Sequence, residues 1–322
     1  MPLPTPPILR PHLTLLNLSL SLSALTASMS TTPAPSSSSP SSSNHPPTLP
    51  TTFPTTPYHP RHATWPYTPA DFTRADPTPD PTFYSAPRYV THIDDHAIRL
   101  LQTYYAQTLP QPGRILDLCS SWISHFPPAL EAAATTTTRT DNNNSTKDPT
   151  QAPDLEVTGL GLSFPELAAN RILTHRITHD LNADPFLPAT VPGELDAATC
   201  VVSVDYLASP REVLGSLRGR MKRGGVVHLV VSNRCFPSKV VGRWLRVDEE
   251  ERLRMVGDYL WFSGWRGVEV VVLSDGRVQG EGGWFGFGGG RVDPLWVVRG
   301  VNVGEAEDAL AQGGMGEARD ER

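Results

Sequence analysis

Between residues 114 and 231, short apolar segments alternate with segments of helical periodicity, and no other feature of the chain restricts its fold so strongly. The apolar segments are residues 115–118, 155–160, 174–178, 196–204 and 226–231. Helices are predicted at 165–173 and 210–221, and strands joined through helices pair in parallel. The chain is therefore predicted to be an α/β protein with a mostly parallel sheet and helices on both faces.

A helix precedes this alternation, and a strand pair ends it. Asp94 or Asp95 can cap a predicted helix that stops at the Pro- and Gly-containing residues 110–113. Near the other end, the apolar segments 268–273 and 295–301 have only a Gly-rich loop between them. Strands joined without a helix pair antiparallel, so the last strand is expected to run against the sheet.

Composition divides the chain into one globular domain and polar flanks. Pro, Ser and Thr dominate residues 1–82, where no acidic residue precedes Asp71, and such a segment lacks the apolar content that ordering requires. Residues 1–82 are therefore predicted to be a disordered or targeting region, and residues 83–303 the folded domain. The low-complexity stretch 132–153 is expected to be a disordered insertion, and residues 304–322 a disordered tail.

The first residues of the chain leave targeting and plain disorder as equal alternatives. Residues 13–25 are apolar with interspersed Ser, and Arg10 and His12 precede them. A secretory signal fits least, because the three cysteines are odd in number and widely spaced. We expect an intracellular protein, either cytoplasmic or organellar, with the mitochondrion among the organelles.

Charge and hydropathy argue against several classes of partner. The formal net charge is −6, whereas nucleic acids and anionic membranes favour a basic face. No apolar run is long enough to span a bilayer. His92 and His96 can share a helical face, but no third ligand accompanies them, so no metal is expected.

A ligand is expected at the stretch 114–127. Asp117 stands just before a turn of small residues at the end of a predicted strand, and a short helix is predicted after the turn at 122–132. In open parallel sheets, ligands bind at the carboxyl ends of strands near the point where strand order reverses. A tight turn and a helix N-terminus present backbone N–H groups there.

Five phrases of the sequence occur in the order of the strand ends of one protein family. They are RILDLCSS, VTGLGLS, HDLN, DAATCVVSVDYL and KRGGVVHLVVSNR. In this order, over residues 84–301, the chain resembles the class I S-adenosylmethionine-dependent methyltransferases. HIDDHAI, SVDYL and SNRCFP also resemble a poorly characterised methyltransferase-like branch found in plants, fungi and bacteria. The resemblance implies a Rossmann-like sheet of seven mostly parallel strands with an antiparallel last strand, S-adenosylmethionine as cofactor, and a small or medium acceptor.

The resemblance also implies which residues contact the cofactor. They are Asp117, Cys119, Ser120, Ser121, Gly161, Leu162, Asp180, Leu181 and Ser203. Asp117 would hold the amino end of the methionine part, beside the backbone of the first turn. Asp180 would accept a hydrogen bond from the adenine amino group, and Leu181 would contact the ring.

Four positions depart from the family pattern. Cys119, Ser121 and Ile123 stand where the family usually has glycine, the residue that most readily adopts positive φ. Gly161 aligns with the acid that usually binds the ribose hydroxyls. Glu166 is either a substitute for that acid or a helix-start residue that interacts with the helix dipole.

The candidates for catalytic residues are His125, Asp205 and Tyr206. His125 follows the first turn and is a candidate general base. Asp205 and Tyr206 either face the acceptor or form a turn into the next helix. Arg88, in an aromatic segment that can fold over the site, either binds a carboxylate or lies on the surface.

Two other function classes are alternatives to a methyltransferase. A binding or interaction protein would keep the fold with a degenerate donor site, since fold alone does not establish activity. A nicotinamide-dependent oxidoreductase fits less well, because the first turn lacks G-x-G-x-x-G and the last two strands have no helix between them.

Overall fold

The computed structural model describes residues 52–141, 155–277 and 292–304. The strands are β1 (Thr55–Pro57), β2 (Arg114–Leu118), β3 (Glu156–Gly161), β4 (His175–Thr178), β5 (Leu195–Val201), β6 (Met221–Ser232), β7 (Arg266–Ser274) and β8 (Leu295–Val301). The helices are α1 (Asp80–Phe83), α2 (Asp95–Thr108), α3 (Pro128–Asp141), α4 (Phe164–Ala169), α5 (Pro210–Arg218) and α6 (Glu249–Phe262), with 3₁₀ turns η1 (Pro69–Phe72) and η2 (Val204–Tyr206). No helix among these residues is long and apolar enough to cross a bilayer.

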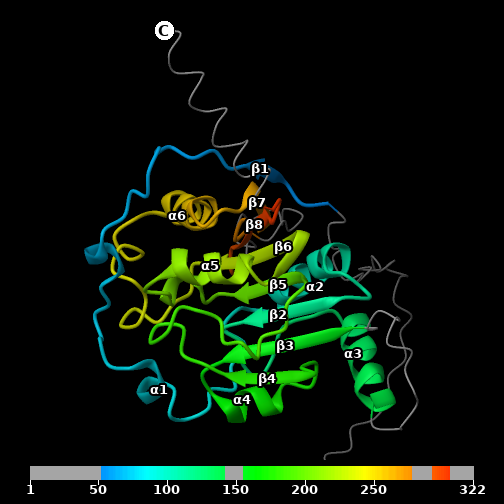
Figure 1. Ribbon diagram of the computed structural model, residues 1–322. Coiled ribbons are helices and arrows are strands. Elements are labelled where there is room, and N and C mark those ends of the chain that lie inside the picture. The colour runs from blue at the N-terminus through cyan, green and yellow to red at the C-terminus, as the bar shows by residue number, and fades with distance from the viewer. Residues whose placement is uncertain (1–51, 142–154, 278–291, 305–322) are drawn as a thin grey trace, which may run out of the picture. The chain divides into compact units, whose positions relative to one another are not determined.

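All of the strands form one sheet in the order β1-β7-β8-β6-β5-β2-β3-β4. Neighbours from β6 to β4 pair in parallel, and Figure 1 shows these strands side by side with β2 between β5 and β3. β8 runs antiparallel to both β6 and β7. The predicted α/β fold with an antiparallel last strand is therefore confirmed. The strand order reverses at β2, so the expected switch point lies between β2 and β5.

Helices cover both faces of the sheet. Successive side chains of a strand point to opposite faces, so the apolar residues of these strands need partners on both sides. In β2, Ile115 belongs to a buried cluster that includes Leu101 and Tyr105 of α2. Its neighbour Leu116 belongs to a second cluster with residues of α5 and α6, among them Leu217. The near-continuous apolar strands recognised in the sequence are thus strands buried on both faces.

The folded part of the chain begins earlier than the sequence predicts. β1 pairs antiparallel with β7 and adds an eighth strand to the seven expected. Tyr67 donates a hydrogen bond to Asp258 of α6 (2.6 Å), and the Tyr58 hydroxyl bonds to the other oxygen of the same carboxylate. The predicted boundary at residue 83 is therefore wrong for residues 52–82; residues 1–51 lie outside the described part of the chain.

Two local predictions near the first turn are also corrected. No helix follows β2 directly: residues 119–127 are irregular, and α3 begins only at Pro128. A proline at the first helical position is compatible with a helix, whereas one further inside would lose a backbone hydrogen bond. α3 continues to Asp141, so residues 132–141 are helical rather than disordered. The remainder of that predicted insertion, 142–154, and the tail from 305 onward lie outside the described residues.

Candidate functional site

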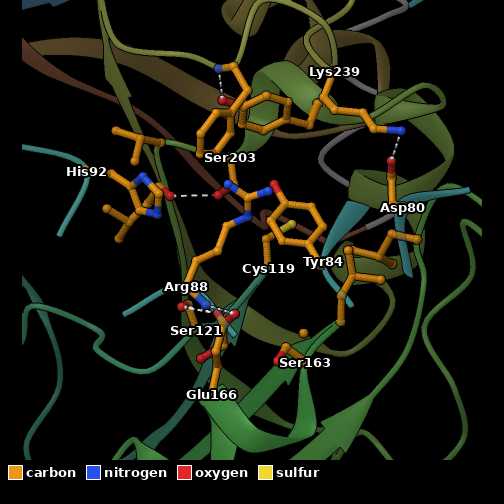
Figure 2. A pocket seen from close by; sticks show the side chains of 18 of the residues that line it. Asp80, Tyr84, Arg88, His92, Cys119, Ser121, Ser163, Glu166, Ser203 and Lys239 are labelled. Carbon is orange, nitrogen blue, oxygen red and sulfur yellow. Dashed lines mark hydrogen bonds and ion pairs between the residues drawn. The ribbon is translucent and has the colours of Figure 1, made fainter. Parts of the chain in front are cut away.

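A cavity of about 360 Å³ lies at the carboxyl ends of the parallel strands (Figure 2). Its walls come from the residues that follow β2, β3, β4, β5 and β6, and from the segment 74–92 that precedes α2. The volume is within the range of about 300–1,000 Å³ typical of small-molecule sites. The cavity therefore occupies the position where open α/β sheets bind ligands.

Sequence-predicted residues from four strand ends meet at this cavity. All nine predicted cofactor residues line it: Asp117, Cys119, Ser120, Ser121, Gly161, Leu162, Asp180, Leu181 and Ser203. His125 and Tyr206 line it as well. Asp205 does not: its side chain is buried in η2, behind the cavity wall, so the expectation that it faces an acceptor is corrected. Cofactor binding by the nine residues remains a prediction.

Asp117 organises the first turn through three hydroxyl groups. Its carboxylate accepts hydrogen bonds from Ser120 (2.6 Å), Ser124 (2.7 Å) and Thr199 (2.9 Å). Burial raises the pKa of this carboxyl, and the three hydrogen bonds oppose that shift. The side chain thus ties the irregular residues 119–124 to β2 and β5.

The first turn has a backbone shape that suits glycine, although no glycine is present. Cys119 has φ of 57°, and the next residue, Ser120, donates its backbone N–H to Leu160 (2.7 Å). This bond brings the Ser120 carbonyl oxygen to 2.1 Å from the place where a Cβ on Gly161 would lie. A side chain at position 161 is therefore excluded, which gives a physical reason why the acid of the family pattern is missing there.

Backbone strain is concentrated around the cavity. Five non-glycine residues of the described chain have positive φ, and four of them line the cavity: His92, Cys119, His125 and Val202. Such conformations cost about 1–3 kcal/mol each and cluster at functional sites. Val202, a β-branched residue with φ of 41°, is the least compatible with its conformation.

Glu166 belongs to the cavity wall rather than to the surface of a helix start. It is 5% exposed, and its carboxylate accepts hydrogen bonds from the Ser121 hydroxyl (2.5 Å) and the Arg88 backbone N–H (2.8 Å). One carboxylate thereby connects α4, the turn after β2 and the segment that leads to α2. The interpretation of Glu166 as a helix-dipole residue alone does not explain these contacts.

A buried ionic network in the cavity wall was not anticipated from the sequence. Asp80 accepts two hydrogen bonds from Arg74 (2.7 and 2.8 Å) and one from the Asn182 amide (2.7 Å), and Lys239 lies 3.5 Å away. Asp80 and Lys239 are 5% and 1% exposed, so their charges compensate each other inside the protein.

The two remaining catalytic candidates have little acid–base power at neutral pH. Burial, together with the neighbouring His92, lowers the pKa of His125 to about 4. The imidazole is therefore uncharged at neutral pH, and its low basicity makes it a weak general base. Burial raises the pKa of Tyr206, whose hydroxyl accepts the backbone N–H of Phe236 (2.7 Å). Among the described residues, no group of three His, Cys, Asp or Glu side chains is placed to hold a metal ion.

Comparisons with known proteins give distant structural matches. No family model and no curated protein matches the chain. The S-adenosylmethionine-dependent methyltransferase SibL aligns at 17% identity over 64% of this chain and 54% of its own length, with a TM-score of 0.34. A TehB-like methyltransferase from Corynebacterium glutamicum aligns at 12% identity over 64% and 86% of the two chains, with a TM-score of 0.34. A methyltransferase from Archaeoglobus fulgidus aligns at 11% identity over 63% and 94%, with a TM-score of 0.38.

At such identities and TM-scores, these likenesses transfer no activity to this chain. The strand order and strand directions are observations of the chain itself, and they agree with the sheet that the sequence resemblance implies. The chain therefore has an α/β fold with a mostly parallel sheet and an antiparallel β8, extended by β1 at one edge.

Proposed function

We propose that this protein binds S-adenosylmethionine in the cavity and transfers its methyl group to a small or medium acceptor. One observation supports this more than any other. The nine residues that sequence resemblance assigns to the cofactor come from four separate strand ends, and all nine line one cavity.

The chemistry of the cavity suits the parts of this cofactor. The Asp180 carboxylate accepts hydrogen bonds from the backbone N–H groups of Asn182 (2.9 Å) and Ala183 (3.3 Å) through Oδ1. Oδ2 is the oxygen that we assign to the adenine amino group. Leu181 supplies apolar surface for the ring. Gly161 has no side chain to offer the ribose, so Glu166 is the carboxylate that we assign to the neighbourhood of its hydroxyls.

The residues of the chain would act mainly by positioning. Bound S-adenosylmethionine supplies an activated methyl group, so no covalent or metal-assisted step is required of the protein. Asp117 holds the turn beneath the methionine part, and the segment 84–92 covers the cavity and excludes water. When binding holds donor and acceptor in the reactive orientation, less entropy is lost in the chemical step, and this lowers the activation barrier. An acceptor that loses a proton only after transfer needs no strong base, which is consistent with the uncharged His125.

Calorimetric titration with S-adenosylmethionine and S-adenosylhomocysteine tests the proposal. Asp180→Ala is expected to weaken both ligands about tenfold or more, because a hydrogen bond to a charged group contributes about 1.5–3 kcal/mol. Asp184→Ala is the matched control, since Asp184 lies in the same turn, is exposed and does not line the cavity. Folded wild-type protein that gives no heat with either ligand at millimolar concentration would favour the non-catalytic interaction protein instead.

A further inference from the structure

Arg88 projects into the cavity from the segment that covers it, as Figure 2 shows. Its backbone N–H is held by Glu166 (2.8 Å), which fixes the start of the side chain. Its guanidinium carbon lies 4.4 Å from the ring centre of Phe83 and 5.3 Å from that of Phe236. Aromatic rings thus contact the guanidinium and hold it in position without neutralising its charge.

The other cationic side chains of the cavity wall all have carboxylate partners. Arg74 and Lys239 lie 2.7 Å and 3.5 Å from Asp80, and Arg234 lies 2.8 Å from Asp293. No such ion pair is found for Arg88 within the described part of the chain. One of its terminal nitrogens donates to the Phe83 carbonyl at 3.3 Å, and its Nε is buried without a hydrogen-bond partner in that part.

A guanidinium that contacts aromatic rings but lacks a carboxylate partner is suited to bind a planar anion. The N–H donors of a guanidinium lie in its own plane and match the two oxygens of a carboxylate. A buried charged donor without a partner is unfavourable, and a ligand carboxylate would remove that cost. Tyr206, Phe236 and Leu207 line the cavity nearby and offer apolar surface to the body of such a ligand.

We infer that Arg88 binds a carboxylate of the methyl acceptor, and that the acceptor is therefore a small organic acid with an apolar body. This inference rests on the proposed function. The side chain lies against Phe236, beyond the end of β6, whereas the residues assigned to the donor follow β2, β3, β4 and β5. That position places Arg88 on the acceptor side of the cavity. The donor's own methionine carboxylate is the other source of the same chemistry, and the test separates the two.

The test is calorimetric titration of full-length protein with benzoate, 4-hydroxybenzoate and cinnamate, each compared with its uncharged primary amide, with and without S-adenosylhomocysteine. At least one acid is expected to bind wild-type protein at least tenfold more tightly than its amide. Arg88→Gln should abolish that preference, and Arg88→Lys should keep part of it because the charge remains. Arg211→Gln is the matched control: Arg211 also lies over an aromatic ring, that of Trp65, but is exposed and outside the cavity.

Two results would overturn the inference. In the first, no acid binds wild-type protein more tightly than its amide. In the second, Arg88→Gln weakens S-adenosylhomocysteine at least tenfold, as removal of a donor contact would. Circular dichroism and thermal melting confirm that each variant is folded. Acid binding that depends on Arg88, in a protein that does not bind S-adenosylhomocysteine, would support the carboxylate site and contradict only the methyl-transfer proposal.

Discussion

Cys119 and Asp205 show how single residues around the cavity are held in unfavourable states. Cys119 keeps a backbone conformation that suits glycine, with φ of 57°. Asp205 is a buried carboxyl whose Oδ2 has no hydrogen-bond partner within the described residues. Each state lowers stability by an amount that a conservative substitution can measure, so each leads to a prediction.

Replacing Cys119 with glycine is expected to make the protein about 0.5–1 kcal/mol more stable than Cys119→Ala. Glycine relieves left-handed strain of about 1–2 kcal/mol, and its greater freedom in the unfolded chain offsets about 0.4–1 kcal/mol of that gain. Cys119→Ala is the control, because it removes the same thiol but keeps the strain. Urea unfolding compares the two variants, and equal stabilities would show that no strain is stored at this position.

Asp205 is expected to make stability fall as pH rises. Burial raises its pKa from the ordinary 3.8 to about 8, so the folded state retains a proton that the unfolded state releases within that range. From about pH 5 to about pH 8, wild-type protein should lose at least about 1 kcal/mol of stability relative to Asp205→Asn. Urea unfolding at both pH values measures this difference. A constant gap between the two proteins would mean that Asp205 is ionised in the folded state.

At the scale of elements, the segment before α2 is part of the fold and of the cavity. Its first strand extends the sheet, Tyr67 bonds to Asp258 of α6, and Arg74 and Asp80 form part of the cavity wall. The same segment continues into Arg88. Attachment of residues 52–80 to α6 therefore supports the residues that cover the cavity.

Tyr67→Phe is expected to destabilise the protein by about 1–3 kcal/mol, because the buried Asp258 carboxylate loses a hydrogen bond that water cannot replace. Tyr89→Phe is the control: Tyr89 is 54% exposed, and a surface change of this kind stays within about 0.5 kcal/mol. Thermal or urea unfolding provides the comparison. Equal effects of the two substitutions would show that the bond to α6 contributes nothing.

At the scale of the whole molecule, the sheet could be predicted because its signals are local. Apolar strands alternate with helices, and Asp94 caps α2 by accepting from the Ala97 N–H (2.8 Å). The cavity could be predicted because strand ends in parallel sheets converge. These rules apply to each element separately and need no knowledge of distant contacts.

The parts that escaped prediction depend on contacts between distant residues. The Pro- and Thr-rich composition before residue 83 conceals aromatic side chains such as Tyr67, whose partner Asp258 is 191 positions away. The irregular path after β2 depends on Asp117, which accepts hydrogen bonds from two hydroxyls in that stretch and one from Thr199 of β5. Lys239 and Asp80 are likewise brought together only by the folded chain.

A crystal structure of the full chain grown with S-adenosylhomocysteine would test most directly that this cavity is a methyl-donor site. The ligand is expected inside the cavity, with its adenine beside Asp180 and Leu181 and its amino-acid part above residues 119–121. The Arg88 guanidinium should remain on the acceptor side, without a contact to the ligand's carboxylate. Ligand bound outside the cavity, or a cavity that stays empty in crystals grown at millimolar ligand, would contradict the proposed function.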